Sequence, residues 1–196
     1  MFIEPNIKNR KSGWIEVICG SMFSGKTEEL IRRIKRAQFA NHSVAIFKPA
    51  TDNRYHESDI VSHDGIRIKS IAITKATDLL EKTKNIDVLG IDEVQFFDEE
   101  IVTVVQELAL QQTRVICAGL DMDFNKNGFG PMPELLAQAD YVTKVHAICS
   151  VCGDMANYSY RKTASEETVV LGEKDVYEPR CRTCYERDDK KQGVIF

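Results

Sequence analysis

The sequence predicts an α/β fold in which a P-loop core with a mostly parallel sheet is followed by a small zinc-ribbon-like domain. Apolar, β-rich segments alternate with amphipathic helical segments, as in sheets that helices cover on both faces. The first apolar segment leads directly into a glycine loop that is typical of phosphate binding. Two C-x-x-C pairs lie close to the C-terminus, after this alternation has ended.

The expected elements follow from the spacing of apolar residues. Strands are predicted over residues 14–19, 43–49, 86–92, 113–120 and 141–149, with a peripheral strand over 67–73. Helices are predicted over 27–38, 76–84, 98–112 and 133–139, and Asp98 is expected to cap the third of them.

The first helix is predicted to be amphipathic. Its apolar residues recur at helical spacing and share one face, on which lie Leu30, Ile31, Ile34 and Ala37. Glu28 and Glu29 each precede an arginine by four residues, at Arg32 and Arg33, which indicates that the opposite face is exposed to solvent.

Three segments are predicted along the chain: a flexible arm over 1–12, a P-loop nucleotide-binding domain over 13–147, and a zinc-binding domain with a C-terminal tail over 148–196. The N-terminal residues lack the apolar stretch of a signal peptide, and no segment approaches the length of a membrane span. We therefore expect a cytoplasmic protein without a membrane partner. The net charge of −4 argues against a dedicated binder of duplex DNA.

Residues 20–27, GSMFSGKT, match the pattern G-x-x-x-x-G-K-[ST] between a predicted strand and a predicted helix. Glycine tolerates a positive φ and lacks a Cβ, so such a loop curls until its backbone N–H groups point inward at phosphate oxygens. The strand and the helix supply the context in which this motif indicates a phosphate site. The loop residues expected to bind ATP are Gly20, Ser21, Met22, Phe23, Ser24, Gly25, Lys26 and Thr27.

Two acids, Asp92 and Glu93, stand at the end of the strand predicted over 86–92. P-loop proteins need a carboxylate at such a position to hold Mg²⁺ through the water shell of the ion, alongside the Ser or Thr of the loop, and Asp92 fits this role. The alternative is that the acids merely open a turn, but the glycine loop favours magnesium. Glu93 is then placed to act on water, as in an ATPase, or on a substrate hydroxyl, as in a kinase.

The residues after these acids, Gln95, Phe96 and Phe97, include two aromatic rings. Rings beside a catalytic carboxylate suit a flat organic substrate, although ordinary core packing explains either ring equally well. Asp52 and Arg54 follow the second predicted strand, at the edge where ligands bind in open α/β sheets. Arg54 is suited to neutralise a migrating phosphoryl group, and spacing alone is also consistent with a surface residue.

The cysteines fall into two classes. Cys19 and Cys117 lie inside apolar segments and are predicted to be small buried side chains. The other four form two C-x-x-C pairs, which predicts a structural Cys₄ zinc site with no open position for water. Disulfides are disfavoured in a reducing compartment, and redox activity of one pair does not explain two. The predicted zinc ligands are Cys149, Cys152, Cys181 and Cys184.

A nucleic-acid surface is the rival interpretation of the C-terminal segment, because zinc ribbons often bind nucleic acids. The segment carries interleaved aromatic and basic residues, namely Tyr158, Tyr160, Arg161, Tyr177, Arg180 and Arg182. Five acids dilute that patch, and the long stretch between the cysteine pairs is better suited to fold over a small ligand, because zinc holds both of its ends.

Five motifs in matching order resemble the type II thymidine kinases: GSMFSGKT, DNRY, DEVQFF, LDMDFNKNGFG and the two cysteine pairs. The similarity runs from about residue 14 to residue 185. The resemblance implies a RecA-like P-loop core, a zinc domain with a lasso loop, and a homotetramer. It also implies transfer of the γ-phosphate of ATP to the 5′-hydroxyl of thymidine or deoxyuridine, giving dTMP in pyrimidine salvage, with feedback inhibition by dTTP and no nucleic-acid partner.

The resemblance also assigns residues. Glu93 matches the general base, Lys26, Thr27 and Asp92 match the phosphate and magnesium residues, and Asp52, Arg54 and Gln95 match positions near the phosphates. The substrate positions are Met22, Phe96, Leu120, Phe124, Ser159, Arg161, Tyr177 and the lasso residues Thr168, Val169, Val170, Leu171 and Gly172. The chain departs from the family pattern at Glu173, where small residues are frequent, and in the arm over 1–12.

Two other hypotheses compete with a deoxynucleoside kinase. One is a nucleic-acid-stimulated ATPase with a zinc ribbon. The acidic net charge and the short chain argue against this hypothesis. The other is a regulatory nucleotide-binding protein without turnover, which the presence of Glu93 disfavours.

Overall fold

The computed structural model describes residues 13–50, 59–61, 67–162 and 176–189. The predicted arm over 1–12, the residues Asp52 and Arg54, the lasso segment Thr168 to Gly172 and the residues after 189 lie outside these ranges. Among the described residues, no helix combines the length and apolar character that crossing a membrane requires.

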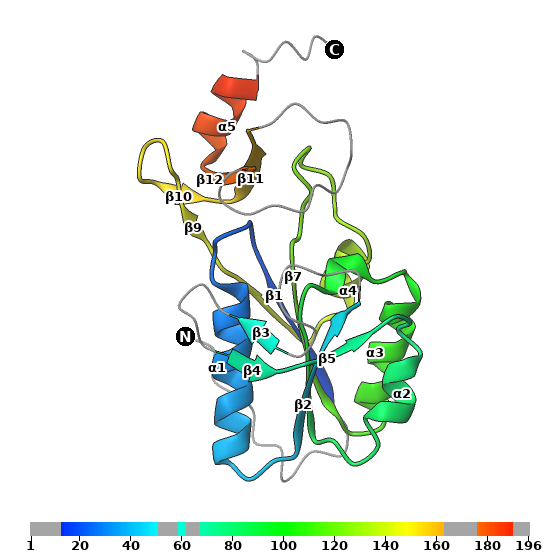
Figure 1. The fold of residues 1–196 in the computed structure, drawn as a ribbon. Helices are drawn as coiled ribbons and strands as arrows, with labels where there is room; N and C mark the ends of the chain where they lie inside the picture. Colours follow the sequence, from blue (N-terminus) through cyan, green and yellow to red (C-terminus); the bar gives the residue numbers. More distant parts are fainter. Residues whose placement is uncertain (1–12, 51–58, 62–66, 163–175, 190–196) are drawn as a thin grey trace.

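A six-stranded, entirely parallel sheet forms the centre of the fold, which confirms the predicted α/β class (Figure 1). Its strand order is β5-β2-β6-β7-β1-β8. The strands are β1 (Trp14–Cys19), β2 (Val44–Pro49), β5 (Ile71–Ile73), β6 (Val88–Ile91), β7 (Arg114–Gly119) and β8 (Tyr141–Lys144). The three central strands β6, β7 and β1 are fully buried, as expected for continuous apolar strands.

Helices cover both faces of this sheet. On one face α1 (Lys26–Phe39) packs through Leu30, Ile31 and Ile34 against Ile18, Ile116 and their neighbours. The other face carries the helices α2 (Asp78–Lys82), α3 (Glu100–Leu110) and α4 (Met132–Gln138) over a larger core. Connections between consecutive parallel strands place the loops after β1, β6 and β7 at one edge of the sheet.

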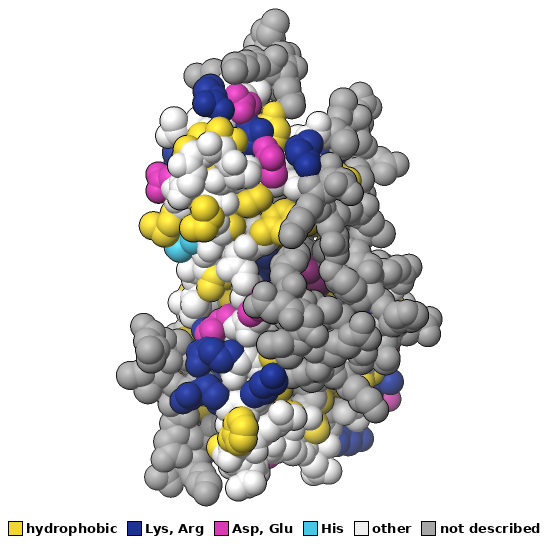
Figure 2. Space-filling model, turned by 60° about the vertical axis from the view of Figure 1, so that its left-hand side comes forward, with side chains coloured by type: hydrophobic (Ala, Val, Ile, Leu, Met, Phe, Trp, Pro, Cys, Tyr) yellow, Lys and Arg dark blue, Asp and Glu magenta, His cyan; other side chains and the backbone are white. Residues whose placement is uncertain are grey.

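The exposed face of α1 is basic, and Figure 2 shows Lys and Arg side chains gathered where this helix lies. The exposed residues include Arg32, Lys35 and Arg36. Arg33, which was predicted on this face, is instead fully buried, because its guanidinium reaches Glu16 on β1 at 2.7 Å. Arg114 on β7 binds the same carboxylate at 2.6 Å, so one buried acid pairs with two arginines.

Beyond the sheet edge, four short strands and a helix form a separate layer, in the upper part of Figure 1. Strands β9 (Ala147–Ile148) and β10 (Met155–Ala156) pair antiparallel, as do β11 (Tyr158–Arg161) and β12 (Tyr177–Arg180). The helix α5 (Arg182–Asp189) follows β12 directly. A further antiparallel pair, β3 (Asp59–Val61) and β4 (Arg67–Lys69), lies outside the main sheet.

Several predicted boundaries were wrong. The strand expected over 141–149 divides into β8 in the sheet and β9 in the upper layer. The residues over 67–73 form two strands, of which β5 joins the sheet edge. Asp98 does not cap α3, whose N-cap is Glu99 without a side-chain hydrogen bond. Residues 186–189, predicted to belong to a tail, are the end of α5.

Candidate active site

The glycine loop joins β1 to α1 at the sheet edge, as predicted. Gly20 has φ 150°, and a Cβ there would lie 2.2 Å from the carbonyl oxygen of Val145. Gly25 has φ 86° and caps the N-terminus of α1 in the left-handed region. Both backbone conformations favour glycine, which explains why the motif has glycine at these two positions. The loop therefore presents the N-terminus of α1, where backbone N–H groups and the helix dipole favour phosphate.

Lys26 and Thr27 begin α1 and face the loop and the neighbouring acid. The ammonium of Lys26 donates to the backbone oxygen of Ser21 at 2.8 Å. The hydroxyl of Thr27 lies 3.1 Å from Oδ2 of Asp92, which follows β6. This contact spans β7, because β6 and β1 are not neighbours in the sheet. The folded chain thus brings the loop hydroxyl and the predicted metal ligand into direct contact.

Asp92 is buried and its environment is electrostatically unusual. Burial, followed by the nearby charge of Glu93, raises the pKa of Asp92 to about 7. The Thr27 hydroxyl and the Lys26 charge act in the opposite direction but are weaker. Thr27 and Asp92 place two hard oxygen donors 3.1 Å apart, and oxygen donors are the ligands that Mg²⁺ prefers, so these residues would suit a magnesium site.

Glu93 occupies a left-handed backbone conformation, φ 52° and ψ 39°, at the start of the short 3₁₀ helix η2 (Val94–Phe96). This conformation is uncommon for a residue other than glycine, asparagine or aspartate and often marks a functional position. The Glu93 amide donates to Oδ1 of Asp92 at 3.1 Å, and its carboxylate accepts a hydrogen bond from the Gln95 side chain at 2.6 Å. The two acids are therefore fixed relative to each other.

The upper layer reaches the glycine loop directly. The amide of Met22 donates to the hydroxyl oxygen of Ser159 at 3.0 Å, and the ring of Phe23 packs against the cluster that contains Cys149, Cys181 and Cys184. The phosphate loop is thus held from above by the C-terminal layer as well as by β1 and α1.

A second group of predicted substrate residues forms a stack in the upper layer. The guanidinium of Arg161 lies 3.5 Å from the ring centroid of Phe124 and donates to the hydroxyl of Tyr177 at 2.7 Å. Cation–π contact of this kind holds both groups in one arrangement. The carbonyl oxygen of Phe124 also accepts a hydrogen bond from the hydroxyl of Tyr185 on α5.

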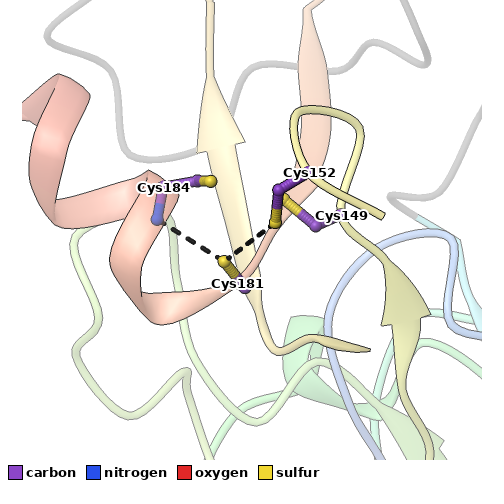
Figure 3. A group of neighbouring side chains, drawn as sticks. All are labelled: Cys149, Cys152, Cys181 and Cys184. Atoms are coloured by element: carbon purple, nitrogen blue, oxygen red, sulfur yellow. Dashed lines mark hydrogen bonds between the residues drawn. The ribbon is translucent and has the colours of Figure 1, made fainter. Parts of the chain in front are cut away.

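The four cysteines of the C-x-x-C pairs converge, as Figure 3 shows. Cys149 and Cys152 come from the turn between β9 and β10, and Cys181 and Cys184 from the beginning of α5. Their sulfurs all lie within 4.8 Å of one another, and those of Cys152 and Cys181 are 3.6 Å apart. A tetrahedral zinc with Zn–S bonds of about 2.3 Å separates its sulfurs by about 3.8 Å, so the cluster fits zinc.

Backbone groups prepare one thiol of this cluster for metal binding. Burial raises the pKa of Cys149, but hydrogen bonds with the backbone of Cys181, Cys152 and Val151 outweigh it and bring the pKa down to about 6. Cys19 and Cys117 are at most 1% exposed, which confirms them as small buried side chains, and burial raises the pKa of Cys19 to about 11 and that of Cys117 to about 12.

Comparison with known proteins agrees with this geometry. The sequence profile of the thymidine kinase family, described as "Thymidine kinase", matches residues 13–185. The chain belongs to the thymidine kinase family. It is therefore a kinase, an enzyme that transfers a phosphoryl group, and a kinase takes that group from ATP.

Curated thymidine kinases match over almost all of this chain. That of Bacteroides thetaiotaomicron is 56% identical over 194 residues, 98% of both chains. That of Porphyromonas gingivalis is 55% identical, covering 90% of this chain and 87% of its own. That of Rhodothermus sp. is 56% identical, covering 89% and 82%. The arm over 1–12 lies outside the family match, as predicted, yet the first of these alignments extends beyond residues 13–185.

Seen as a thymidine kinase, the chain brings most of its predicted site residues into contacting groups. Lys26, Thr27, Asp92 and Glu93 form one group, and Phe124, Arg161 and Tyr177 another. Phe96 is half-buried against Phe129, with ring centroids 5.6 Å apart. Phe97, offered as an alternative substrate ring, belongs to the core with 7% of its surface exposed.

Sequence reasoning missed three residues that shape this thymidine kinase site. The hydroxyl of Tyr185 donates a hydrogen bond to the backbone oxygen of Phe124. In the sequence, only its position directly after Cys184 could have pointed to Tyr185. Asp121, just after β7, forms an ion pair with Lys144 at the end of β8, with 2.6 Å between the charged atoms. The strand β1, which leads into the glycine loop, lies between β7 and β8 in the sheet. The loop that carries Phe124 is held internally, because the Asp123 carboxylate accepts the amides two and four residues later at 2.8 and 2.9 Å.

Proposed function

We propose that the protein transfers the γ-phosphoryl group of ATP to the 5′-hydroxyl of thymidine, or of deoxyuridine, and so forms dTMP for pyrimidine salvage. The observation that carries the proposal is the meeting of Thr27, Asp92 and Glu93 at the phosphate loop of a chain in the thymidine kinase family. A carboxylate beside the metal position is suited to a hydroxyl nucleophile.

The chain's own residues supply the steps of this reaction. The loop amides and Lys26 hold the phosphates, while Thr27 and Asp92 hold Mg²⁺, which neutralises phosphate charge when bound. Glu93 accepts the proton of the 5′-hydroxyl. The freed oxygen forms a bond to the γ-phosphorus as the bond from that phosphorus to the β–γ bridging oxygen breaks, and ADP leaves. Asp52 and Arg54 are proposed to contact the phosphates, by resemblance to the family.

The nucleoside is proposed to lie between the loop and the upper layer. The residues assigned to it are Met22, Phe96, Leu120, Phe124, Ser159, Arg161, Tyr177 and the segment Thr168 to Gly172. The contact between Met22 and Ser159 supports this assignment, because it joins the phosphate loop to the layer that carries Arg161, whose guanidinium contacts Phe124. We propose a boundary between the two domains at residues 147 and 148.

Zinc is proposed to be structural. The fit of the four sulfurs supports this, and a Cys₄ site leaves no position for a substrate. Such a site requires reduced thiols, which supports the proposed cytoplasmic location.

Feedback inhibition by dTTP and a homotetrameric assembly are further proposals from the family. A single dTTP molecule carries both a thymine and a triphosphate, so it can bind the proposed nucleoside residues and the phosphate loop at the same time. Size-exclusion chromatography with light scattering tests the tetramer, and competition of dTTP against each substrate tests the inhibition.

A nucleic-acid-stimulated ATPase is disfavoured by the burial of the residues that suggested it. Of the six aromatic and basic residues, Tyr158, Tyr160, Arg161, Tyr177 and Arg180 are each at most 8% exposed. The deciding assay measures ADP release from ATP and Mg²⁺ after adding thymidine or single-stranded DNA. We expect thymidine to stimulate release. Stimulation by DNA alone would reject the proposed function.

A further inference from the structure

Gln95 is a buried side chain whose amide is engaged at both ends. Its Nε2 donates to Oε2 of Glu93 at 2.6 Å, and its Oε1 accepts the backbone N–H of Leu120 at 3.0 Å. Only 2% of the residue is exposed. The family resemblance places Gln95 near the phosphates, and in the structure its side chain joins the acid after β6 to the end of β7.

The Leu120 amide fixes which way the Gln95 amide points. A backbone N–H donates only, so the atom facing it is the carbonyl oxygen of Gln95. The NH₂ group must then face Glu93 and donate to it. This hydrogen bond holds Oε2 of Glu93 in a fixed place relative to the end of β7.

Packing removes other positions for the Gln95 side chain. Gly119 lies against it, and a Cβ on Gly119 would approach Gln95 Oε1 to 2.7 Å. Glu93, by contrast, follows a strand in a tight turn, and its side chain has three rotatable bonds. A rigid buried amide that holds one end of a rotatable carboxylate sets the direction in which the carboxylate faces.

We propose that Gln95 is a positioning residue that aims the Glu93 carboxylate for proton transfer from the nucleoside hydroxyl. The inference rests on the proposed function of Glu93 as the base. In this proposal Gln95 acts through Glu93 and the end of β7.

The test compares Gln95→Met, which removes the amide at similar length, with Gln95→Glu, which keeps the shape and places a like charge beside Glu93. For both we expect kcat to fall about 10- to 100-fold, with KM for ATP and thymidine changed less than about threefold, as for loss of orientation. Gln111→Met, an exposed glutamine, is the control for the chemical change.

A second measurement isolates the action through Glu93. In a Glu93→Gln background the Gln95→Met change should have little further effect on kcat, because the group it positions is gone. A normal kcat in Gln95→Met would overturn the proposal, and a raised KM for ATP beside it would show that Gln95 is a nucleotide ligand. If Glu93→Gln itself keeps the wild-type rate, the proposed function fails first, and that result is seen without any Gln95 variant.

Discussion

The hydroxyl of Tyr185 donates a hydrogen bond to the backbone oxygen of Phe124. Tyr185 directly follows the fourth cysteine of the cluster, is 4% exposed, and packs against the rings of Tyr158 and Tyr160 at 5.3 and 5.6 Å. The first turn of α5 thus connects the cysteine cluster to the loop that carries a proposed nucleoside residue.

Removal of this hydroxyl should weaken nucleoside binding. In Tyr185→Phe we expect KM for thymidine to rise about 3- to 10-fold, the equivalent of one net hydrogen bond, with kcat and zinc content unchanged. Steady-state kinetics and elemental analysis measure these quantities. Tyr141→Phe on β8 removes a hydroxyl elsewhere in the chain and serves as the control. An equal rise in KM for thymidine in that variant would contradict a specific role of the Tyr185 hydroxyl.

Loss of zinc should impair both substrates. We expect one zinc per chain, and Cys152→Ser should lose it. Because Phe23 of the phosphate loop packs on the cysteine cluster and Met22 is bound by Ser159, KM should then rise for ATP as well as for thymidine. Ser150→Ala, in the same turn, should keep zinc and both KM values. A zinc-free variant with unchanged KM for ATP would show that the cluster does not support the loop.

The buried Glu16 should contribute strongly to stability. Glu16→Met leaves Arg33 and Arg114 buried without their shared acid, so the free energy of unfolding in urea should fall by about 3 to 5 kcal/mol. Arg32→Ala breaks the half-exposed pair with Glu29 and should cost less than about 1 kcal/mol. Similar losses in the two variants would mean that the buried network is not a major source of stability.

Asp92 should make stability depend on pH when magnesium is absent. Its pKa is about 7 in the folded chain and about 3.9 in the unfolded chain, so the folded state binds more protons between these values. This contribution to stability is complete below about pH 4 and is lost as pH rises through about 7. Urea unfolding of wild type and Asp92→Asn in magnesium-free buffer at several pH values gives the difference. Parallel curves would show that folding does not raise the pKa of Asp92.

Local patterns predicted most of the core and its loop. The glycine motif, the acid after β6 and the cysteine spacing are each set by residues close in sequence, and the structure places them as expected. Arg33 shows the limit of such patterns. Its spacing from Glu29 correctly predicted their ion pair, but its burial depends on Glu16, seventeen residues away on another element.

Two other features escaped sequence analysis for related reasons. The segment of α5 is mostly polar, so its helix gave no apolar periodicity and is held instead by the cysteine turn and by Tyr185. The hydrogen bond between Gln95 and Leu120 joins two residues that are 25 positions apart in the sequence. They meet because β6 and β7, which precede them, are neighbours in the sheet, and the sequence alone does not reveal that order. Side chains whose partners lie on other elements were therefore the hardest to assign.

The most direct test of the central claim follows the phosphoryl group itself. Protein incubated with ATP labelled at the γ-phosphate, Mg²⁺ and thymidine should yield labelled dTMP, and Glu93→Gln should lower that rate about 10²- to 10⁴-fold while still binding ATP. Absence of labelled dTMP from the wild-type protein, or an undiminished rate in Glu93→Gln, would contradict the account.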